Sequence, residues 1–206
     1  MSEHHEVTMA ELRQQLLTKE NELQQLRQQI AELIRHDVLT GVMNRRTLIE
    51  MLNAELQRSH RTGHPFCFAI IDLDEFHRIN ERFGRDVGDN VLRTVSEASI
   101  KLLRVLDRFG RLGGEEFGIV LPATWLDSGV IAMNRLRAAV SACDWADITP
   151  GTTVTFSAGL TTNATGDSAE KVIERAEAAL LQAKQKGRNC TITLEADMPD
   201  MPMFDD

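Results

Sequence analysis

The chain has 206 residues, 42% of them apolar, which predicts one globular domain of ordinary size with a smaller attachment. Its formal net charge of −8 argues against a protein that binds duplex nucleic acid through a basic face, but not against a nucleotide enzyme, where a metal ion supplies positive charge locally. The three cysteines fit neither a disulfide framework nor a zinc site, the polar N-terminus has no secretory signal, and no apolar run nears the roughly 20 residues of a membrane span, so a cytoplasmic protein is expected.

Residues 1–36 are predicted to form a coiled coil. Apolar residues recur at alternating spacings of three and four from Met9 to Leu33, which is the heptad pattern of coiled coils. One core position is Lys19, which can fix the register or the oligomeric state at some cost in stability. An amphipathic helix that lies on its own domain is the alternative, but the apolar stripe is narrow and the other positions are rich in glutamine. We therefore expect a parallel two-stranded homodimer.

Residues 37–194 are predicted to form one α/β or α+β domain, in which helices cover a central sheet. Helical spacing predicts helices at residues 45–62, 76–83, 87–103, 125–142 and 168–186. Strands are expected at residues 66–72, 108–112, 117–121, 152–161 and 190–194, and the first is a continuous apolar run that suits a strand buried on both faces. The acidic tail, residues 195–206, is rich in methionine and proline and is expected to be disordered.

Two carboxylates stand where the first apolar strand ends. Alternation would put Asp72 and Asp74 on the same side if the strand continued. Carboxylates at the end of a buried strand are a usual way to hold Mg²⁺, because this ion takes oxygen ligands. A capping aspartate before the helix at Phe76 explains the pair equally well, so the motif alone leaves both interpretations open.

The segment Gly113-Gly114-Glu115-Glu116-Phe117 joins two short apolar strands. Glycine suits the positive φ of a tight hairpin, and its lack of a side chain lets a sugar or phosphate approach the backbone. A hairpin does not need two adjacent glutamates, whose like charges repel each other. Metal binding or proton transfer would explain them.

This hairpin resembles the signature of the GGDEF family of diguanylate cyclases, in its Gly-Gly-Glu-Glu-Phe form. An opening motif at residues 37–46, a metal and guanine motif at residues 72–89 and a closing motif at residues 183–189 follow the family order, and the resemblance covers about residues 37–194. It implies a five-stranded sheet wrapped by helices, similar to nucleotidyl cyclases and polymerase palms. It also implies that two facing domains, each with one GTP, form cyclic di-GMP and two pyrophosphates with Mg²⁺ or Mn²⁺.

The resemblance implies roles for the acidic residues. Asp72 and Glu115 would hold the metal ions, with the carbonyl of Leu73 as a further ligand. Glu116 is the candidate base for the ribose 3′-hydroxyl, although either glutamate could take this role.

The resemblance also implies the contacts to GTP. Asn80 and Asp89 would read guanine, because a carboxylate accepts from the donors on the guanine edge. Lys184 and Arg188 would bind the triphosphate, whereas from the residues alone they complement a helix dipole. His77 stands where the family commonly has Lys, and carries a charge only when protonated. The remaining GTP contacts that the resemblance implies are Phe76, Arg85, Gly113 and Gly114.

The run Arg104-Val105-Leu106-Asp107 ends five residues before the hairpin signature, where the family has an inhibitory product site. By itself, this pair would be a surface ion pair of little energetic worth. The resemblance implies inhibition by intercalated cyclic di-GMP at Arg104 and Asp107, with Arg135 on the next helix as a second contact.

Three other functions are alternatives to a diguanylate cyclase. A catalytically silent domain could bind GTP or cyclic di-GMP as a receptor, but Asp72, Asn80, Asp89, Glu115 and Glu116 are all intact. A cyclase that makes a mixed dinucleotide is disfavoured by the guanine-reading aspartate. A coiled-coil adaptor leaves the carboxylates at two separate chain positions unexplained.

Overall fold

The computed structural model describes residues 2–33 and 35–196, and its contacts divide the chain into two units, Met1–Arg35 and His36–Asp206. The predicted disordered tail, residues 195–206, lies outside the described residues from position 197 onwards. Across residues 2–33 and 35–196, no helix combines the length and apolar character that crossing a membrane would require.

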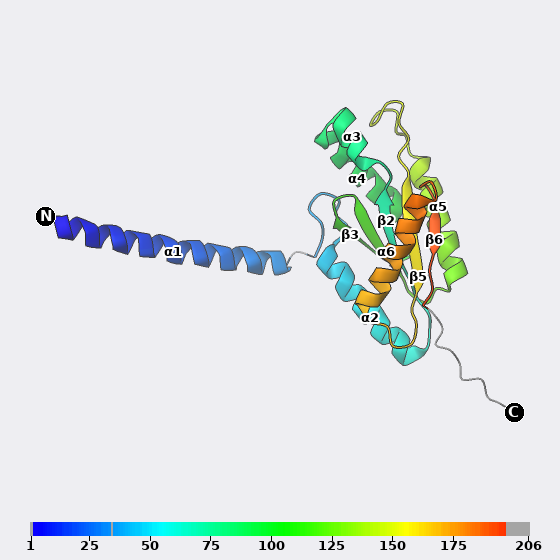
Figure 1. Cartoon of the computed structure of the whole chain (residues 1–206), viewed down its shortest axis with the longest axis horizontal. Helices are drawn as coiled ribbons and strands as arrows, with labels where there is room; N and C mark the ends of the chain where they lie inside the picture. Colours follow the sequence, from blue (N-terminus) through cyan, green and yellow to red (C-terminus); the bar gives the residue numbers. More distant parts are fainter. Residues whose placement is uncertain (1, 34, 197–206) are drawn as a thin grey trace. The chain divides into compact units, whose positions relative to one another are not determined.

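The first unit is one helix, α1 (Ser2–Leu33) (Figure 1). The apolar heptad residues of this helix face solvent, and each of those described is between 50% and 59% exposed. These side chains are Leu12, Leu16, Leu23, Leu26 and Ile30. Lys19, the polar core position, forms an exposed ion pair of 2.7 Å with Glu22. The side chains of the outermost heptad residues, Met9 and Leu33, lie outside the described set, and the coiled-coil dimer stays a prediction.

The second unit is a mixed sheet in the strand order β1-β3-β4-β2-β5-β6. The strands are β1 (Met43–Asn44), β2 (Cys67–Leu73), β3 (Arg108–Gly113), β4 (Glu116–Leu121), β5 (Phe156–Thr162) and β6 (Thr191–Thr193). The α/β fold is thereby confirmed, but this sheet has six strands where the resemblance implied five. The additional strand, β1, pairs in parallel with β3 over two residues and is too short for any sequence periodicity.

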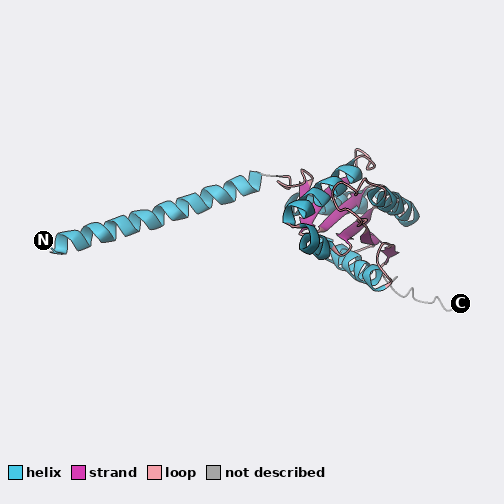
Figure 2. Cartoon of the chain, turned by 90° about the horizontal axis from the view of Figure 1, so that it is seen from above, coloured by secondary structure: helices cyan, strands magenta, loops and turns pink. Residues whose placement is uncertain are grey.

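Helices pack on both faces of this sheet, and Figure 2 shows the strands between them. They are α2 (Arg45–Thr62), α3 (Phe76–Phe83), α4 (Arg85–Ile100), α5 (Leu126–Ser141) and α6 (Ala169–Gln185). Local sequence sets several of their ends. The Asn44 side chain accepts a hydrogen bond from the Thr47 N–H at the start of α2, and Gly63 ends that helix with φ +71°. The Ser168 side chain caps α6 in the same way.

Strand β2 supplies both hydrophobic cores, because its successive side chains point to opposite faces. Cys67, Ala69, Ile71 and Leu73 pack in the core that contains α4 and α5 residues. Phe68 and Ile70 pack in the core that contains α2 and α6 residues. Every residue of β2 is buried, as the apolar run predicted. The strand therefore fixes where its last residues, Asp72 and Leu73, are placed.

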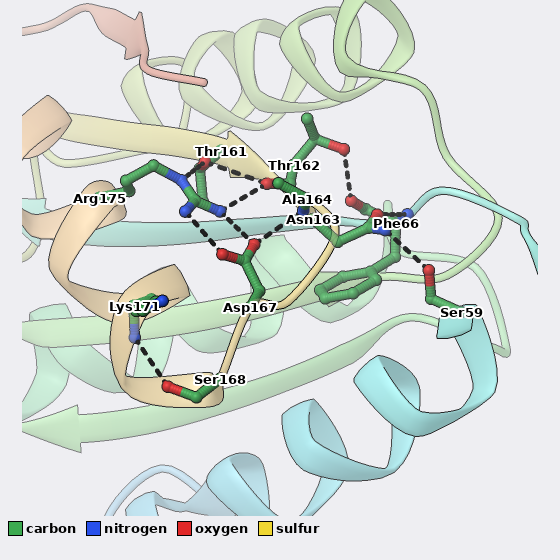
Figure 3. Close-up of polar contacts among 10 residues, drawn as sticks. All are labelled: Ser59, Phe66, Thr161, Thr162, Asn163, Ala164, Asp167, Ser168, Lys171 and Arg175. Carbon is green, nitrogen blue, oxygen red and sulfur yellow. Dashed lines mark hydrogen bonds and ion pairs between the residues drawn. The ribbon is translucent and has the colours of Figure 1, made fainter. Parts of the chain in front are cut away.

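A polar network fixes the β5–α6 connection at the end of the sheet where β2 begins (Figure 3). Arg175 lies 2.6 Å from Asp167 and also donates to the carbonyl of Thr162 at 2.9 Å. Asn163 accepts from the Phe66 N–H at 2.8 Å. Burial would raise the pKa of Asp167, but hydrogen bonds from Arg175 and from the Ala164 N–H outweigh burial and lower it. This network stabilises the end of the domain opposite the hairpin.

Candidate active site

Asp72 and Leu73 end β2 beside the hairpin that joins β3 to β4. Asp72 faces Glu116 in the antiparallel pairing of β2 with β4. The Leu73 N–H donates to the carbonyl of Glu115 at 3.4 Å. The strand ladder therefore brings together the four residues predicted for metal binding and proton transfer, although the two pairs are more than 40 positions apart in the chain.

The carboxylates at this end of the sheet share one lysine. Asp72 is 7% exposed, and its Oδ2 lies 2.8 Å from Lys184 Nζ at the end of α6. Burial raises the pKa of Asp72, with help from the charges of Glu115 and Asp74, although Lys184 opposes the shift. Burial and the charge of Asp72 also raise the pKa of Glu116. Crowded carboxylates with one ammonium group form a site that a cation would stabilise.

The oxygen donors at this site suit Mg²⁺ or Mn²⁺. Asp72 and Glu115 offer carboxylate oxygens and Leu73 offers a carbonyl, and such hard ligands are the ones these ions take. Within residues 2–33 and 35–196, no three His, Cys, Asp or Glu side chains are already grouped around a metal position. Phosphate oxygens and water would therefore have to complete the coordination shell.

Asp74 has a structural role, and not the role in metal binding or in helix capping that the sequence suggested. It is 9% exposed, and it accepts from Thr155 Oγ1 at 2.7 Å, Ser157 Oγ at 2.6 Å and the Asn189 N–H at 3.0 Å. These three donors occupy its oxygens, so Asp74 ties the β2–α3 turn to β5 and to the turn after α6. Asp74 is a structural tie between segments that are far apart in the sequence.

The predicted guanine readers lie on two adjacent helices, Asn80 on α3 and Asp89 on α4. Gly88 allows these helices to approach: a Cβ at this position would lie 1.9 Å from Asn80 Oδ1 and 3.2 Å from the ring of Phe76. The glycine therefore leaves room for the Asn80 amide next to Asp89. Both residues are partly exposed, as a pair that contacts a ligand must be.

The other predicted GTP contacts differ in their exposure. Phe76 is 7% exposed and belongs to the core, and the tip of its ring lies next to Gly88. His77 and Arg85 are exposed, near the starts of α3 and α4. Gly113 and Gly114 are exposed at the hairpin tip with φ of +152° and +49°, and the second value favours glycine strongly.

The two cations predicted for the triphosphate are both paired with acids of the β2–α3 segment. Lys184 contacts Asp72, as described above, and Arg188 Nη2 lies 3.0 Å from Glu75 Oε1. The next residue, Asn189, is held from a second side by Arg137 of α5, whose Nη1 donates to its carbonyl and to its Oδ1 at 2.9 Å each.

Arg111 on β3 is a site residue that sequence reasoning missed. Its Nε and Nη2 donate to the carbonyl of Gly114 at 2.9 and 2.7 Å. Its Nη1 lies 3.2 Å from Asp37, in the opening motif. Burial would raise the pKa of Asp37, but hydrogen bonds from Thr40 and Arg111 outweigh it and lower that pKa. The sequence offered one signal for this role, since Arg111 is a charged residue inside a short strand just before the hairpin.

Comparison with known proteins decides the family. A family model described as diguanylate cyclase, GGDEF domain, matches residues 34–190. This chain belongs to the GGDEF family. The family membership that the hairpin and the other motifs indicated is thereby confirmed. DgcP, a diguanylate cyclase of Pseudomonas aeruginosa, is 43% identical to this GGDEF domain over 153 residues, which are 74% of this chain and 23% of DgcP. The chain thus spans less than a quarter of that relative.

Solved structures of GGDEF proteins show the same fold. The diguanylate cyclase SiaD of Pseudomonas aeruginosa, in complex with its activator SiaC, superposes with a TM-score of 0.73 at 34% identity, over 94% of this chain and 75% of SiaD. The structure of the coiled coil and GGDEF domain of DgcB from Caulobacter crescentus, in complex with c-di-GMP, superposes with a TM-score of 0.74 at 26% identity, over 89% of this chain and 99% of the solved DgcB chain.

The three residues predicted for product binding line one pocket of this GGDEF domain, formed mainly by the α4–β3 loop and α5. The Asp107 carboxylate accepts from the backbone N–H of Arg104 at 2.7 Å, and Arg135 Nη2 donates to the carbonyl of Leu102 at 2.9 Å. Asp107 thus shapes the turn that carries Arg104, whose own side chain is exposed. The residues are brought together around one concave surface.

Proposed function

We propose that this chain is a diguanylate cyclase, which condenses two GTP molecules into cyclic di-GMP and releases two pyrophosphates. The observation that carries the proposal is the meeting of Asp72, Glu115 and Glu116 at one end of the sheet, with Lys184 2.8 Å from Asp72. Relatives that are named diguanylate cyclases support it. Because GTP is a cytoplasmic nucleotide, the proposal implies a cytoplasmic enzyme.

In the proposed reaction, the 3′-hydroxyl of each GTP attacks the α-phosphorus of the other. The bond to pyrophosphate breaks, and the hydroxyl proton passes to a carboxylate. Glu116 is the proposed base, because it faces Asp72 in the pairing of β2 with β4, with Glu115 as the alternative. Catalysis would otherwise consist of positioning and charge neutralisation. The proposed contacts to substrate are Asn80, Asp89, Lys184 and Arg188.

Mg²⁺ is the proposed cofactor, and Mn²⁺ is expected to substitute for it. Asp72, Glu115 and the carbonyl of Leu73 would hold the ion. When bound, the ion would supply positive charge to the phosphates and lower the pKa of the attacking hydroxyl. Asp72→Asn is expected to abolish turnover while leaving the fold intact by circular dichroism.

Two domains must face each other in this reaction, because each would hold one GTP. Helix α1 is the proposed dimerisation element, and its exposed leucine stripe supports this role. The similarity to DgcB, whose solved structure includes a coiled coil, also supports it.

Product inhibition at Arg104, Asp107 and Arg135 is the proposed regulation. The pocket that these residues line supports it. Arg104→Ala should raise the concentration of cyclic di-GMP needed for half-inhibition, with little change in the initial rate. An unchanged inhibition curve would exclude this site.

A receptor for GTP or cyclic di-GMP is the second candidate, and the product pocket would serve it equally well. Incubation with GTP and Mg²⁺, followed by chromatography of the nucleotides, separates the two. Formation of cyclic di-GMP supports the cyclase, whereas bound but unconverted GTP supports the receptor.

A further inference from the structure

Glu75 is an acidic residue in an unusual backbone conformation, at the turn between β2 and α3. Its φ of +55° lies in the left-handed region, which side-chain-bearing residues seldom occupy. Two residues of the turn after α6, Arg188 and Asn189, also have positive φ, of +63° and +43°. Such strain persists only where surrounding contacts hold it, and it gathers at functional sites.

The contacts of Glu75 reach the predicted triphosphate site. Its Oε1 lies 3.0 Å from Arg188 Nη2. Its Oε2 is buried and lies 2.8 Å from Arg78 Nε, without the alignment of a hydrogen bond. The side chain of Glu75 is 29% exposed and that of Arg188 is 49% exposed, so water partly screens their ion pair.

The backbone of Arg188 is held by other groups. Its own N–H donates to the carbonyl of Ala183 at 3.1 Å, and the next N–H, of Asn189, donates to Asp74 at 3.0 Å. Glu75 is therefore not needed to keep this turn in place. What Glu75 affects is the direction of the Arg188 guanidinium and the net charge of the pair.

We propose that Glu75 competes with the triphosphate of GTP for Arg188, and so lowers the affinity of the site for its substrate. This inference rests on the proposed function. Both cations proposed to bind phosphate are paired with acids, but the two pairs differ. Asp72 gains another partner if a metal ion binds, whereas Glu75 lies outside the proposed metal ligands. Only the substrate opens the pair of Glu75 with Arg188, and the loss of this ion pair is what would lower the affinity.

The test measures binding of 3′-deoxy-GTP, which lacks the attacking hydroxyl, by calorimetry with Mg²⁺ present. Glu75→Gln should tighten binding by roughly two- to five-fold, the range that a partly exposed ion pair provides. Such a gain in affinity separates competition from a structural role, because a damaged fold would weaken binding. Glu81→Gln is the matched control, since it removes the same charge from an exposed position of α3. Its affinity should equal that of the wild type.

A double-mutant cycle completes the test. In an Arg188→Gln background, Glu75→Gln should no longer change the affinity. Unchanged or weaker binding by Glu75→Gln, or equal tightening by Glu81→Gln, would overturn the inference. If the wild-type chain makes cyclic di-GMP and either of these contradicting results is found, only the inference about Glu75 fails. If the wild type binds no nucleotide, the proposed function fails together with it.

Discussion

Arg111 links the hairpin to Asp37, which lies 74 residues before Arg111, and Arg111→Ala measures what this link contributes. The side chains of Arg111 and Asp37 are only 16% and 23% exposed, so their ion pair is shielded from water. Hydrogen bonds to a charged group contribute about 1.5–3 kcal/mol. The bonds to the Gly114 carbonyl add less, because water replaces them at the exposed hairpin tip. We therefore expect Arg111→Ala to lower the free energy of unfolding by about 2–4 kcal/mol.

Urea denaturation followed by circular dichroism gives this free energy. Arg46→Ala is the matched control, because Arg46 forms an exposed ion pair with Glu50, for which a loss below about 0.5 kcal/mol is expected. Asp37→Asn combined with Arg111→Ala completes a double-mutant cycle, with an expected coupling of about 1–2 kcal/mol. Equal losses for Arg111→Ala and Arg46→Ala, or zero coupling, would refute the reasoning.

Three further changes test other parts of the structure. Gly88→Ala should raise the KM for GTP by about ten-fold, because the added Cβ would displace the Asn80 amide and remove about one hydrogen bond to guanine. Steady-state kinetics measure the KM, and an unchanged value would contradict the role of Asn80. Leu23→Asp should convert the proposed dimer to monomer in analytical ultracentrifugation and lower turnover at low protein concentration. Gln24→Asp, at a solvent-facing heptad position, should do neither. Asp167→Asn should remove a stabilisation that is complete above the ordinary pKa of 3.8 and is lost as the pH falls through the lowered pKa of the folded state. In urea denaturation, the free energies of unfolding of the wild type and the variant should therefore differ at pH 7 and converge at strongly acidic pH.

Local patterns in the sequence predicted the elements that depend on local causes. The apolar run before Asp72 predicted a strand buried on both faces. Strand β2 is such a strand, because helices cover both of its faces. The predicted strand at residues 152–161 instead begins at Phe156, because Phe156 pairs with Leu73, the last residue of β2. Pairing with β3, far along the chain, creates the two-residue strand β1, so no local pattern could reveal it.

The acidic cluster could be assembled from the sequence only through the family resemblance. Spacing alone allowed Asp72 and Asp74 to share one site, but Asp74 is drawn away by partners more than 80 residues distant. The pair of Glu75 with Arg188 spans 113 residues and likewise has no local signature. Long-range contacts therefore decide which of several neighbouring carboxylates remain available for chemistry.

The most direct test of the central claim is the conversion of GTP to cyclic di-GMP, measured with Mg²⁺ over a range of protein concentrations. The proposed function predicts that cyclic di-GMP forms, that the rate per mole of protein rises with protein concentration, and that Glu116→Gln abolishes the product. GTP that binds but stays unconverted at every concentration would contradict it.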